Sequence, residues 1–156
     1  MSAPALSSAA RQLLDKVERR DARFAVVGMG YVGLPLAVVF AEAGLDVVGV
    51  DVSAERMAEL NRGKSYIEDI PNERLAPLVA SGKLRGTSNF GVLAEADAIS
   101  ICVPTPLGKT RDPDMSFIAA ATEQVAQHLR SGQVIVLEST TYPGTTREVI
   151  QPELET

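Results

Sequence analysis

Several residue types are scarce in this chain of 156 residues, and each scarcity excludes a class of protein. A single cysteine, Cys102, excludes a disulfide framework and a cysteine-based zinc cluster, and it is typical of a reducing compartment. A single histidine, His128, leaves no histidine-rich metal site. Tryptophan is absent and aromatic residues make up 4%, so we expect no platform for base stacking. Lys and Arg number 15 against 20 Asp and Glu, and this net charge of −5 argues against a nucleic-acid partner.

Long apolar runs are also lacking. None approaches the ~20 residues that span a bilayer, so we expect no membrane partner. The N-terminal stretch has no apolar signal-peptide core and carries acidic residues, which predicts no secretion signal and a cytoplasmic location. Its apolar positions have the spacing of a short amphipathic helix that lies on the domain: Ala10, Leu13, Leu14 and Val17. We therefore expect a helical extension over residues 1–20 and a single domain over residues 21–156.

What the chain does contain is an alternation of apolar runs and helical spacing. The composition, 46% apolar and 22% charged, is that of a globular protein with its own core. Four apolar runs predict buried strands, at residues 24–27, 47–50, 98–103 and 134–137, and residues 84–87 are a candidate for a further short strand. Helices are expected at residues 34–43, 53–63, 72–79 and 115–129, and Thr145 with Glu148 predicts a capping box for a last helix. This order indicates an α/β fold with a doubly wound, mainly parallel sheet and helices on both faces.

Three glycines follow the first predicted strand in the pattern G-x-G-x-x-G and lead into a helix: Gly28, Gly30 and Gly33. In that setting the first glycine permits a tight turn, the second lets the backbone approach a pyrophosphate, and the third lets helix and strand pack closely. The helix N-terminus then offers N–H groups and the positive end of its dipole to the phosphates. The pattern therefore predicts dinucleotide binding on a Rossmann-type sheet. The alternative is a glycine-rich turn without a ligand.

An acidic residue, Asp51, ends the next predicted strand, 18 residues after Gly33. A carboxylate at this place hydrogen-bonds the ribose hydroxyls of the adenosine and opposes a 2′-phosphate, which favours NAD over NADP. Arg56 weakens this argument, because an arginine nearby can bind a 2′-phosphate. Since the acid is present, we expect Arg56 to contact the adenosine end of NAD. The alternative is an ordinary surface charge.

Two further strand ends carry polar residues. Residues 103–106 read Val-Pro-Thr-Pro and follow a strand that we expect beside the first one. Ligands of open α/β sheets bind outside the carboxyl ends of such strands, so we expect Thr105 to meet the cofactor. The alternative is a loop that two prolines merely stiffen. Residues 138–146 leave the next strand with more hydroxyl groups than a plain connection needs.

Two other features do not indicate chemistry. Gly108, Lys109 and Thr110 resemble the end of a phosphate-binding P-loop, but that motif needs a glycine where this chain has Val103. Cys102 lies inside an apolar strand, where a cysteine is typically a core residue rather than a thiolate nucleophile.

Four motifs occur in one order along the chain: G-x-G-Y-V-G-L-P-L-A from Gly28, V-D-x-x-x-x-R from Val50, C-V-P-T-P from Cys102 and E-S-T-T-Y-P-G-T-T from Glu138. Together they resemble the N-terminal, NAD-binding domain of the UDP-glucose/GDP-mannose dehydrogenase family over residues 20–156. Within the family the chain is most similar to the UDP-N-acetylglucosamine 6-dehydrogenase branch. The last motif and the loop at residues 104–113 indicate that branch.

The resemblance implies roles for individual residues. By motif position, the expected cofactor-binding residues are Gly28, Gly30, Tyr31, Val32, Gly33, Asp51, Arg56, Thr105, Glu138 and Thr146. Thr140 matches the threonine that helps to hold a hydrolytic water near the nicotinamide, which makes it the expected catalytic residue. The family's nucleophilic cysteine and the lysine, asparagine and aspartate beside it have no match in this chain, and Cys102 does not occupy the nucleophile's place.

The resemblance also implies an activity. The family has two Rossmann-like domains and oxidises the C6 alcohol of a nucleotide sugar to a carboxylate with two NAD. We therefore expect the NAD-binding domain of a homo-oligomeric enzyme that acts on UDP-N-acetylglucosamine, with the C-terminal domains absent here and this chain inactive alone. UDP-glucose and UDP-N-acetylmannosamine are alternative substrates. A β-hydroxyacid dehydrogenase, which shares only the glycine pattern, and an NAD-sensing domain without chemistry are alternative functions.

Overall fold

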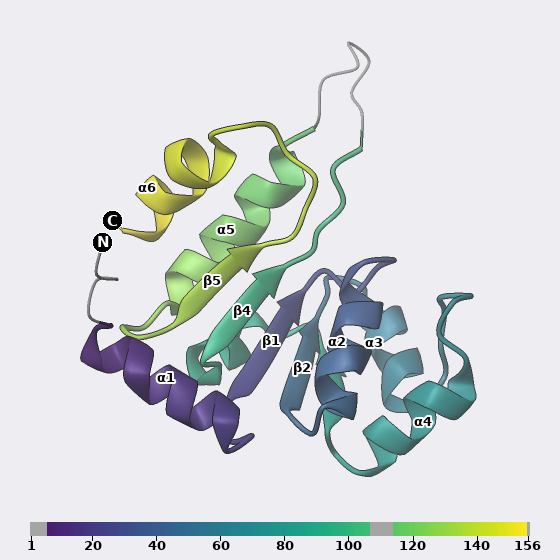
Figure 1. Ribbon diagram of the computed structural model, residues 1–156. Helices are drawn as coiled ribbons and strands as arrows, with labels where there is room; N and C mark the ends of the chain where they lie inside the picture. Colours follow the sequence, from purple (N-terminus) through teal and green to yellow (C-terminus); the bar gives the residue numbers. More distant parts are fainter. Residues whose placement is uncertain (1–5, 107–113, 156) are drawn as a thin grey trace.

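The computed structural model describes residues 6–106 and 114–155, which form a sheet with helices on both faces (Figure 1). A parallel strand must be followed by a crossover before the next strand can pair, and the chain has this order. In sequence its elements are α1 Ser8–Glu18, β1 Arg23–Val27, α2 Gly33–Glu42, β2 Asp46–Val50, α3 Ala54–Asn61, α4 Asn72–Ala80, β3 Leu84–Thr87, the 3-10 helix η1 Phe90–Glu95, β4 Ala98–Ile101, α5 Ser116–His128, β5 Val134–Leu137, the π-helical turn η2 Thr146–Ile150 and α6 Gln151–Leu154.

The five strands pair in the order β3-β2-β1-β4-β5, and every pair is parallel. Strand β1 lies at the centre, where Val27 pairs with Val50 of β2 on one side and with Ile101 of β4 on the other. The order therefore reverses between β1 and β4, which creates a switch point at their carboxyl ends. The predicted fold class, a doubly wound parallel sheet with helices on both faces, is confirmed.

Two apolar layers cover the sheet, because side chains along each strand alternate between its faces. On one face Val26 and Val47 pack with α2, α3 and α4. On the other face Val27 and Val50 pack with η1 and α5. Figure 1 shows α5 and α6 together on one side of the sheet and α2, α3 and α4 on the other.

Strand β5 differs from the continuous buried run that we expected. Ile135 and Leu137 pack against the α5 side, but Val134 and Val136, on the opposite face, are 42% and 36% exposed. The physical reason is position: β5 is an edge strand, and the helices that follow β4 and β5 pack on one face only. A continuous apolar run therefore does not show whether helices cover both faces of the strand.

Helix α1 forms where the spacing predicted it, but its apolar stripe is not buried: Leu14 is 49% and Val17 37% exposed. The helix is held by charge instead. Buried Asp97, just before β4, accepts hydrogen bonds from Lys16 Nζ of α1 at 2.7 Å, from the backbone N–H of Arg23 at 3.0 Å and from Arg130 at 3.1 Å. Burial opposes ionisation of Asp97, but these three donors outweigh it and lower the pKa of the carboxyl group. The domain boundary at residue 20 stays a prediction.

The start of the last helix corrects the sequence analysis. Thr145 does not cap the helix, because no helix N–H donates to its hydroxyl oxygen; the hydroxyl itself donates to the carbonyl of Tyr142 at 2.9 Å. The backbone N–H of Glu148 donates to the carbonyl of Gly144, and the chain makes one π-helical turn before α6 begins. The capping box was therefore wrong, and the helix η1 was missed because its six residues are too few to show a period.

Candidate functional site

A cleft with a volume of about 880 Å³ lies at the carboxyl ends of β1, β2, β4 and β5. Parallel strands bring their carboxyl ends to one edge of the sheet, and the reversal of strand order leaves space there. Residues from all four strand ends, and from the segment that precedes α4, line the cleft: Gly28, Gly30, Tyr31, Val32, Asp51, Val52, Ser53, Glu55, Arg56, Glu59, Tyr66, Ile67, Cys102, Val103, Pro104, Thr105, Glu138, Ser139 and Thr140.

The three glycines of the first turn differ in what a side chain at each position would contact. Gly28 has φ +90°, and a Cβ there would come within 2.9 Å of the backbone of Cys102. A Cβ at Gly33 would collide with the carbonyl oxygen of Gly28. A Cβ at Gly30 would meet no atom within 4 Å. The fold therefore requires glycine at 28 and 33, whereas the glycine at 30 keeps open a space that the protein itself does not fill.

Helix α2 begins at Gly33, directly after this turn, and its N-cap residue Val32 makes no side-chain capping bond. Tyr31 and Val32 are 80% and 55% exposed beside the helix N-terminus. The first N–H groups of a helix have no partner within the helix, and at this end no side chain caps them. The arrangement suits an anion that accepts hydrogen bonds from the start of the helix.

Asp51 follows β2 and is 8% exposed. Its Oδ2 accepts a hydrogen bond from the backbone N–H of Met29 at 2.8 Å, and its Oδ1 accepts one from the N–H of Ser53 at 2.9 Å. A carboxylate has about four acceptor positions, so each oxygen keeps capacity for a further donor in the cleft. Asp51 thus joins the end of β2 to the glycine turn while it faces the cleft.

Arg56 and Tyr66 form a pair that the sequence did not reveal. The guanidinium carbon of Arg56 lies 5.8 Å from the centroid of the Tyr66 ring, within the range of a cation–π contact. The Tyr66 hydroxyl donates to the carbonyl of Met29 at 2.9 Å. Tyr66 lies in the polar stretch between α3 and α4, where the only available signal was one aromatic residue among polar neighbours.

The ends of β4 and β5 form the other wall of the cleft. Half-buried Thr105 and exposed Glu138 and Thr140 line it, as their positions after two strands predicted. Between them, the hydroxyl of Ser139 donates to the carbonyl of Val103 at 2.6 Å and joins the two loops. Thr146 is not brought to the cleft: it is an exposed residue at the start of η2. The roles of all these residues stay predictions.

Cys102 also reaches the cleft, although it is only 6% exposed. Burial, and to a lesser degree the charge of Glu138, raise the pKa of its thiol to about 12. At neutral pH the group is therefore a thiol rather than a thiolate. The prediction that Cys102 is a core residue is confirmed.

A second, more apolar hollow of about 460 Å³ adjoins the cleft beside Asp51. Val50, Val52 and Val103 line one side of it, and Phe90 and Phe117 line the other. Arg56 and Pro104 border both spaces, so the two lie side by side, and the second is the more apolar. This is the usual composition of a pocket for an organic cofactor.

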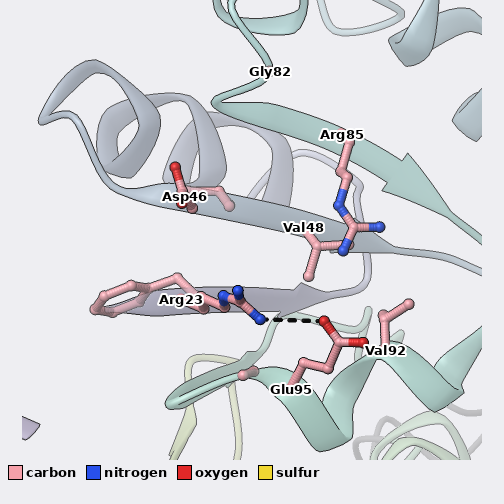
Figure 2. A pocket seen from close by; sticks show the side chains of 10 residues that line it. Arg23, Asp46, Val48, Gly82, Arg85, Val92 and Glu95 are labelled. Atoms are coloured by element: carbon pink, nitrogen blue, oxygen red, sulfur yellow. Dashed lines mark hydrogen bonds and ion pairs between the residues drawn. The ribbon is translucent and has the colours of Figure 1, made fainter. Parts of the chain in front are cut away.

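A third hollow, of about 240 Å³, lies at the opposite end of the sheet near the start of β1 (Figure 2). Figure 2 shows that the Arg23 guanidinium points toward Glu95, with which it forms an ion pair of 3.3 Å. Asp46, on the same wall, pairs with Lys83 at 2.7 Å. Its acidic groups are thus exposed and already paired, so this hollow offers no buried polar group to a ligand.

Three remaining features are the P-loop-like residues, a metal site and a membrane-spanning helix. Gly108, Lys109 and Thr110 lie outside the described residues. Within residues 6–106 and 114–155, no three His, Cys, Asp or Glu side chains are grouped as ligands for a metal ion. Over the same residues, no helix has the length and apolarity needed to cross a membrane.

Comparison with known families shows to which family the chain belongs. The model of the NAD-binding domain of the UDP-glucose/GDP-mannose dehydrogenase family matches residues 22–156. The chain belongs to this family. It is a NAD-binding domain of nucleotide-sugar dehydrogenases, and the predictions of the family and of NAD as the cofactor are confirmed.

Relatives within the UDP-glucose/GDP-mannose dehydrogenase family act on different nucleotide sugars, as their names state. The chain is 40% identical to UDP-N-acetyl-D-mannosamine dehydrogenase of Pyrococcus horikoshii over 128 residues, which is 81% of this chain and 30% of that protein. It is 38% identical to UDP-N-acetyl-D-glucosamine 6-dehydrogenase of Pseudomonas aeruginosa over 136 residues, which is 87% of this chain and 31% of that protein. The chain thus spans about 30% of the length of these relatives.

Solved structures of other dehydrogenases have a fold similar to that of this chain. The crystal structure of NDP-N-acetyl-D-galactosaminuronic acid dehydrogenase from Methanosarcina mazei Go1 matches with a TM-score of 0.82 and 33% identity, over 97% of this chain and 34% of that one. A ternary complex of GDP-mannose dehydrogenase from Pseudomonas aeruginosa matches with a TM-score of 0.81 and 33% identity, over 85% of this chain and 32% of that one.

Proposed function

We propose that NAD binds across the cleft and the apolar hollow that adjoins it. The observation that carries this proposal is the open space at Gly30, which is bordered by the α2 N-terminus and by the carboxylate of Asp51. A pyrophosphate needs such a close approach to backbone N–H groups, and a ribose diol needs such an acceptor. The chemistry of the residues present therefore fits the cofactor.

The rest of the cofactor follows from these two anchors. The adenine ring, which is flat and apolar on its faces, fits the hollow lined by Val52, Phe90 and Phe117. Arg56 stands beside the adenosine, and the exposed side chains of Tyr31 and Val32 flank the pyrophosphate. The nicotinamide then lies toward the other wall, where the hydroxyls and the carboxylate are found: Thr105, Glu138 and Thr140. Thr146 would join this set only through a change in the loop that precedes η2.

In the whole protein, we propose a dehydrogenase that oxidises the C6 alcohol of UDP-N-acetylglucosamine to a carboxylate with two NAD, as a homo-oligomer in the cytoplasm. NAD supplies the hydride acceptor. Thr140, exposed on the cleft wall, holds a water for the hydrolytic step, and Glu138 lines the same pocket. UDP-N-acetylmannosamine is the second candidate substrate, because one relative that carries this activity is 40% identical.

We expect the 156-residue chain alone to bind NAD but to form no NADH, because the nucleophilic cysteine of the family and the lysine, asparagine and aspartate beside it have no match in this chain. The thiol of Cys102 is buried and has a raised pKa, which disfavours the thiolate that attacks carbonyl carbon. No other residue of this chain has a thiol, the group needed to form a thioester.

Calorimetric titration of the purified chain with NAD tests the cofactor site, and absorbance at the NADH band tests the chemistry. We expect saturable NAD binding and no absorbance change with UDP-N-acetylglucosamine, UDP-N-acetylmannosamine or UDP-glucose. Absence of NAD binding would refute the site. Steady NADH formation by the chain alone would refute the assignment of the nucleophile to another part of the protein.

A further inference from the structure

The peptide of Met29, between the first two glycines of the cofactor turn, is held from both sides. Its N–H donates to Asp51 at 2.8 Å, and its carbonyl accepts from the hydroxyl of Tyr66 at 2.9 Å. The Met29 side chain is fully buried and lies over Gly49 of β2, where a Cβ would come within 2.6 Å of its sulfur. Asp51 has an expected role toward the cofactor, whereas Tyr66 has none assigned.

The hydroxyl of Tyr66 is well suited to remain a donor. Burial, and next the charge of Asp51, raise the pKa of this phenol, so it is protonated at neutral pH. The ring is packed against the apolar layer of α2, α3 and α4, which fixes its position. The segment that carries it is held in turn, because the N–H of Ser65 donates to the Asn72 side chain at 2.8 Å.

The same ring faces Arg56. Among the described residues, the guanidinium of Arg56 forms no ion pair, although Glu55 and Glu59 border the same cleft. Its contact with the Tyr66 ring is therefore the interaction that restricts where this long, exposed side chain lies. An arginine released at this place could turn toward a 2′-phosphate.

We propose that Tyr66 is a positioning residue for the cofactor: its hydroxyl fixes the glycine turn, and its ring holds Arg56 where NAD, rather than NADP, is accommodated. This proposal rests on the cofactor site proposed above. It assigns two separable functions to one side chain, and two substitutions separate them. Tyr66→Phe keeps the ring and removes the hydroxyl, whereas Tyr66→Leu removes both.

Calorimetric titration with NAD and NADP, on the 156-residue chain, tests the two functions. We expect Tyr66→Phe to raise the Kd of both dinucleotides by a similar factor of about 3–10, the effect of one hydrogen bond, and to leave their ratio unchanged. Tyr66→Leu should in addition narrow the preference for NAD by about 2–5-fold, since the cation–π contact is lost. The ratio of the two Kd values does not depend on the folded fraction, so partial unfolding of Tyr66→Leu does not obscure this result.

A double-mutant cycle supplies the control. If Tyr66→Leu weakens the preference for NAD by releasing Arg56, it should not change the ratio of the NADP and NAD Kd values further in a protein that already carries Arg56→Ala. Wild-type Kd values in both Tyr66 variants, or the same narrowing in the Arg56→Ala background, would overturn the proposal. Gly30→Val tests the cofactor site separately from Tyr66. If that variant also binds NAD like the wild type, the cofactor site and the role of Tyr66 are both wrong.

Discussion

Substitution of Gly30 by valine separates what the cofactor needs from what the fold needs. The Cβ position of residue 30 meets no atom within 4 Å, so the substituted side chain has room in the free protein. We therefore expect the free energy of unfolding to change by no more than about 0.5 kcal/mol, as at other sites without close neighbours. The three added carbons would occupy the place of the pyrophosphate, so the Kd for NAD should rise at least 100-fold, or by about 2.7 kcal/mol.

The matched control is Gly33→Ala, which adds a single carbon three residues further on. That carbon would collide with the carbonyl oxygen of Gly28, and overpacking of this kind costs about 1–3 kcal/mol or more. Chemical denaturation measures the stability of both variants, and calorimetry measures their NAD affinity. Wild-type affinity in Gly30→Val would refute the phosphate site, and equal destabilisation by the two substitutions would refute the distinction between the glycines.

Three further predictions concern other charged or titratable groups. Asp51→Ser should narrow the preference for NAD over NADP by about tenfold, the effect of a hydrogen bond to a charged group, and equal affinities in the wild type on titration with both dinucleotides would contradict it. Because the folded pKa of Asp97 lies below its ordinary value of 3.8, its contribution to stability is complete above that pH and is lost as the pH falls through the folded pKa. Asp97→Asn should therefore destabilise the protein at pH 7 but much less near pH 2, and urea unfolding curves with the same difference at both pH values would exclude this. The thiol of Cys102, with a pKa raised to about 12, should react with a disulfide reagent at pH 8 far more slowly in the folded protein than in urea; equal rates would show that it is not protected.

Most of the sheet could be predicted from the sequence because every strand except β3 is an apolar run with a clear end. β3 and β5 have the predicted bounds, and the other strands differ by one or two residues at their ends. One neighbour was predicted correctly, because the strand expected beside the first one is β4, which pairs with β1. The rest of the pairing order could not be predicted from these runs, since it depends on contacts between distant segments. The exposure of Val134 and Val136 is a result of that order, and a local pattern does not contain it.

The site was predicted only in part, for a similar reason. Gly28, Asp51 and Thr105 are found at strand ends, so a motif and a strand boundary together locate them. Tyr66 comes from an irregular segment between two helices, and its hydroxyl reaches Met29 from 37 residues away. Ser139 was one hydroxyl among several after β5, and only the structure distinguishes it as the one that joins the loops. Thr145 matched a capping pattern, but the backbone N–H of Glu148 that a cap would bind donates to the carbonyl of Gly144 instead.

The walls of the cleft come from segments that are far apart in the chain: Gly28 and Thr140, which both line it, are separated by 112 positions. The last wall is present only after β5 has joined the sheet, so no partly folded form offers NAD the same contacts. A ligand that binds only the native state stabilises it, by about 2.7 kcal/mol at a concentration of 100 times its Kd. With NAD bound at the proposed site, the cofactor would therefore contribute to the folding equilibrium of the domain, and the amount of folded protein would depend on the dinucleotide concentration around it.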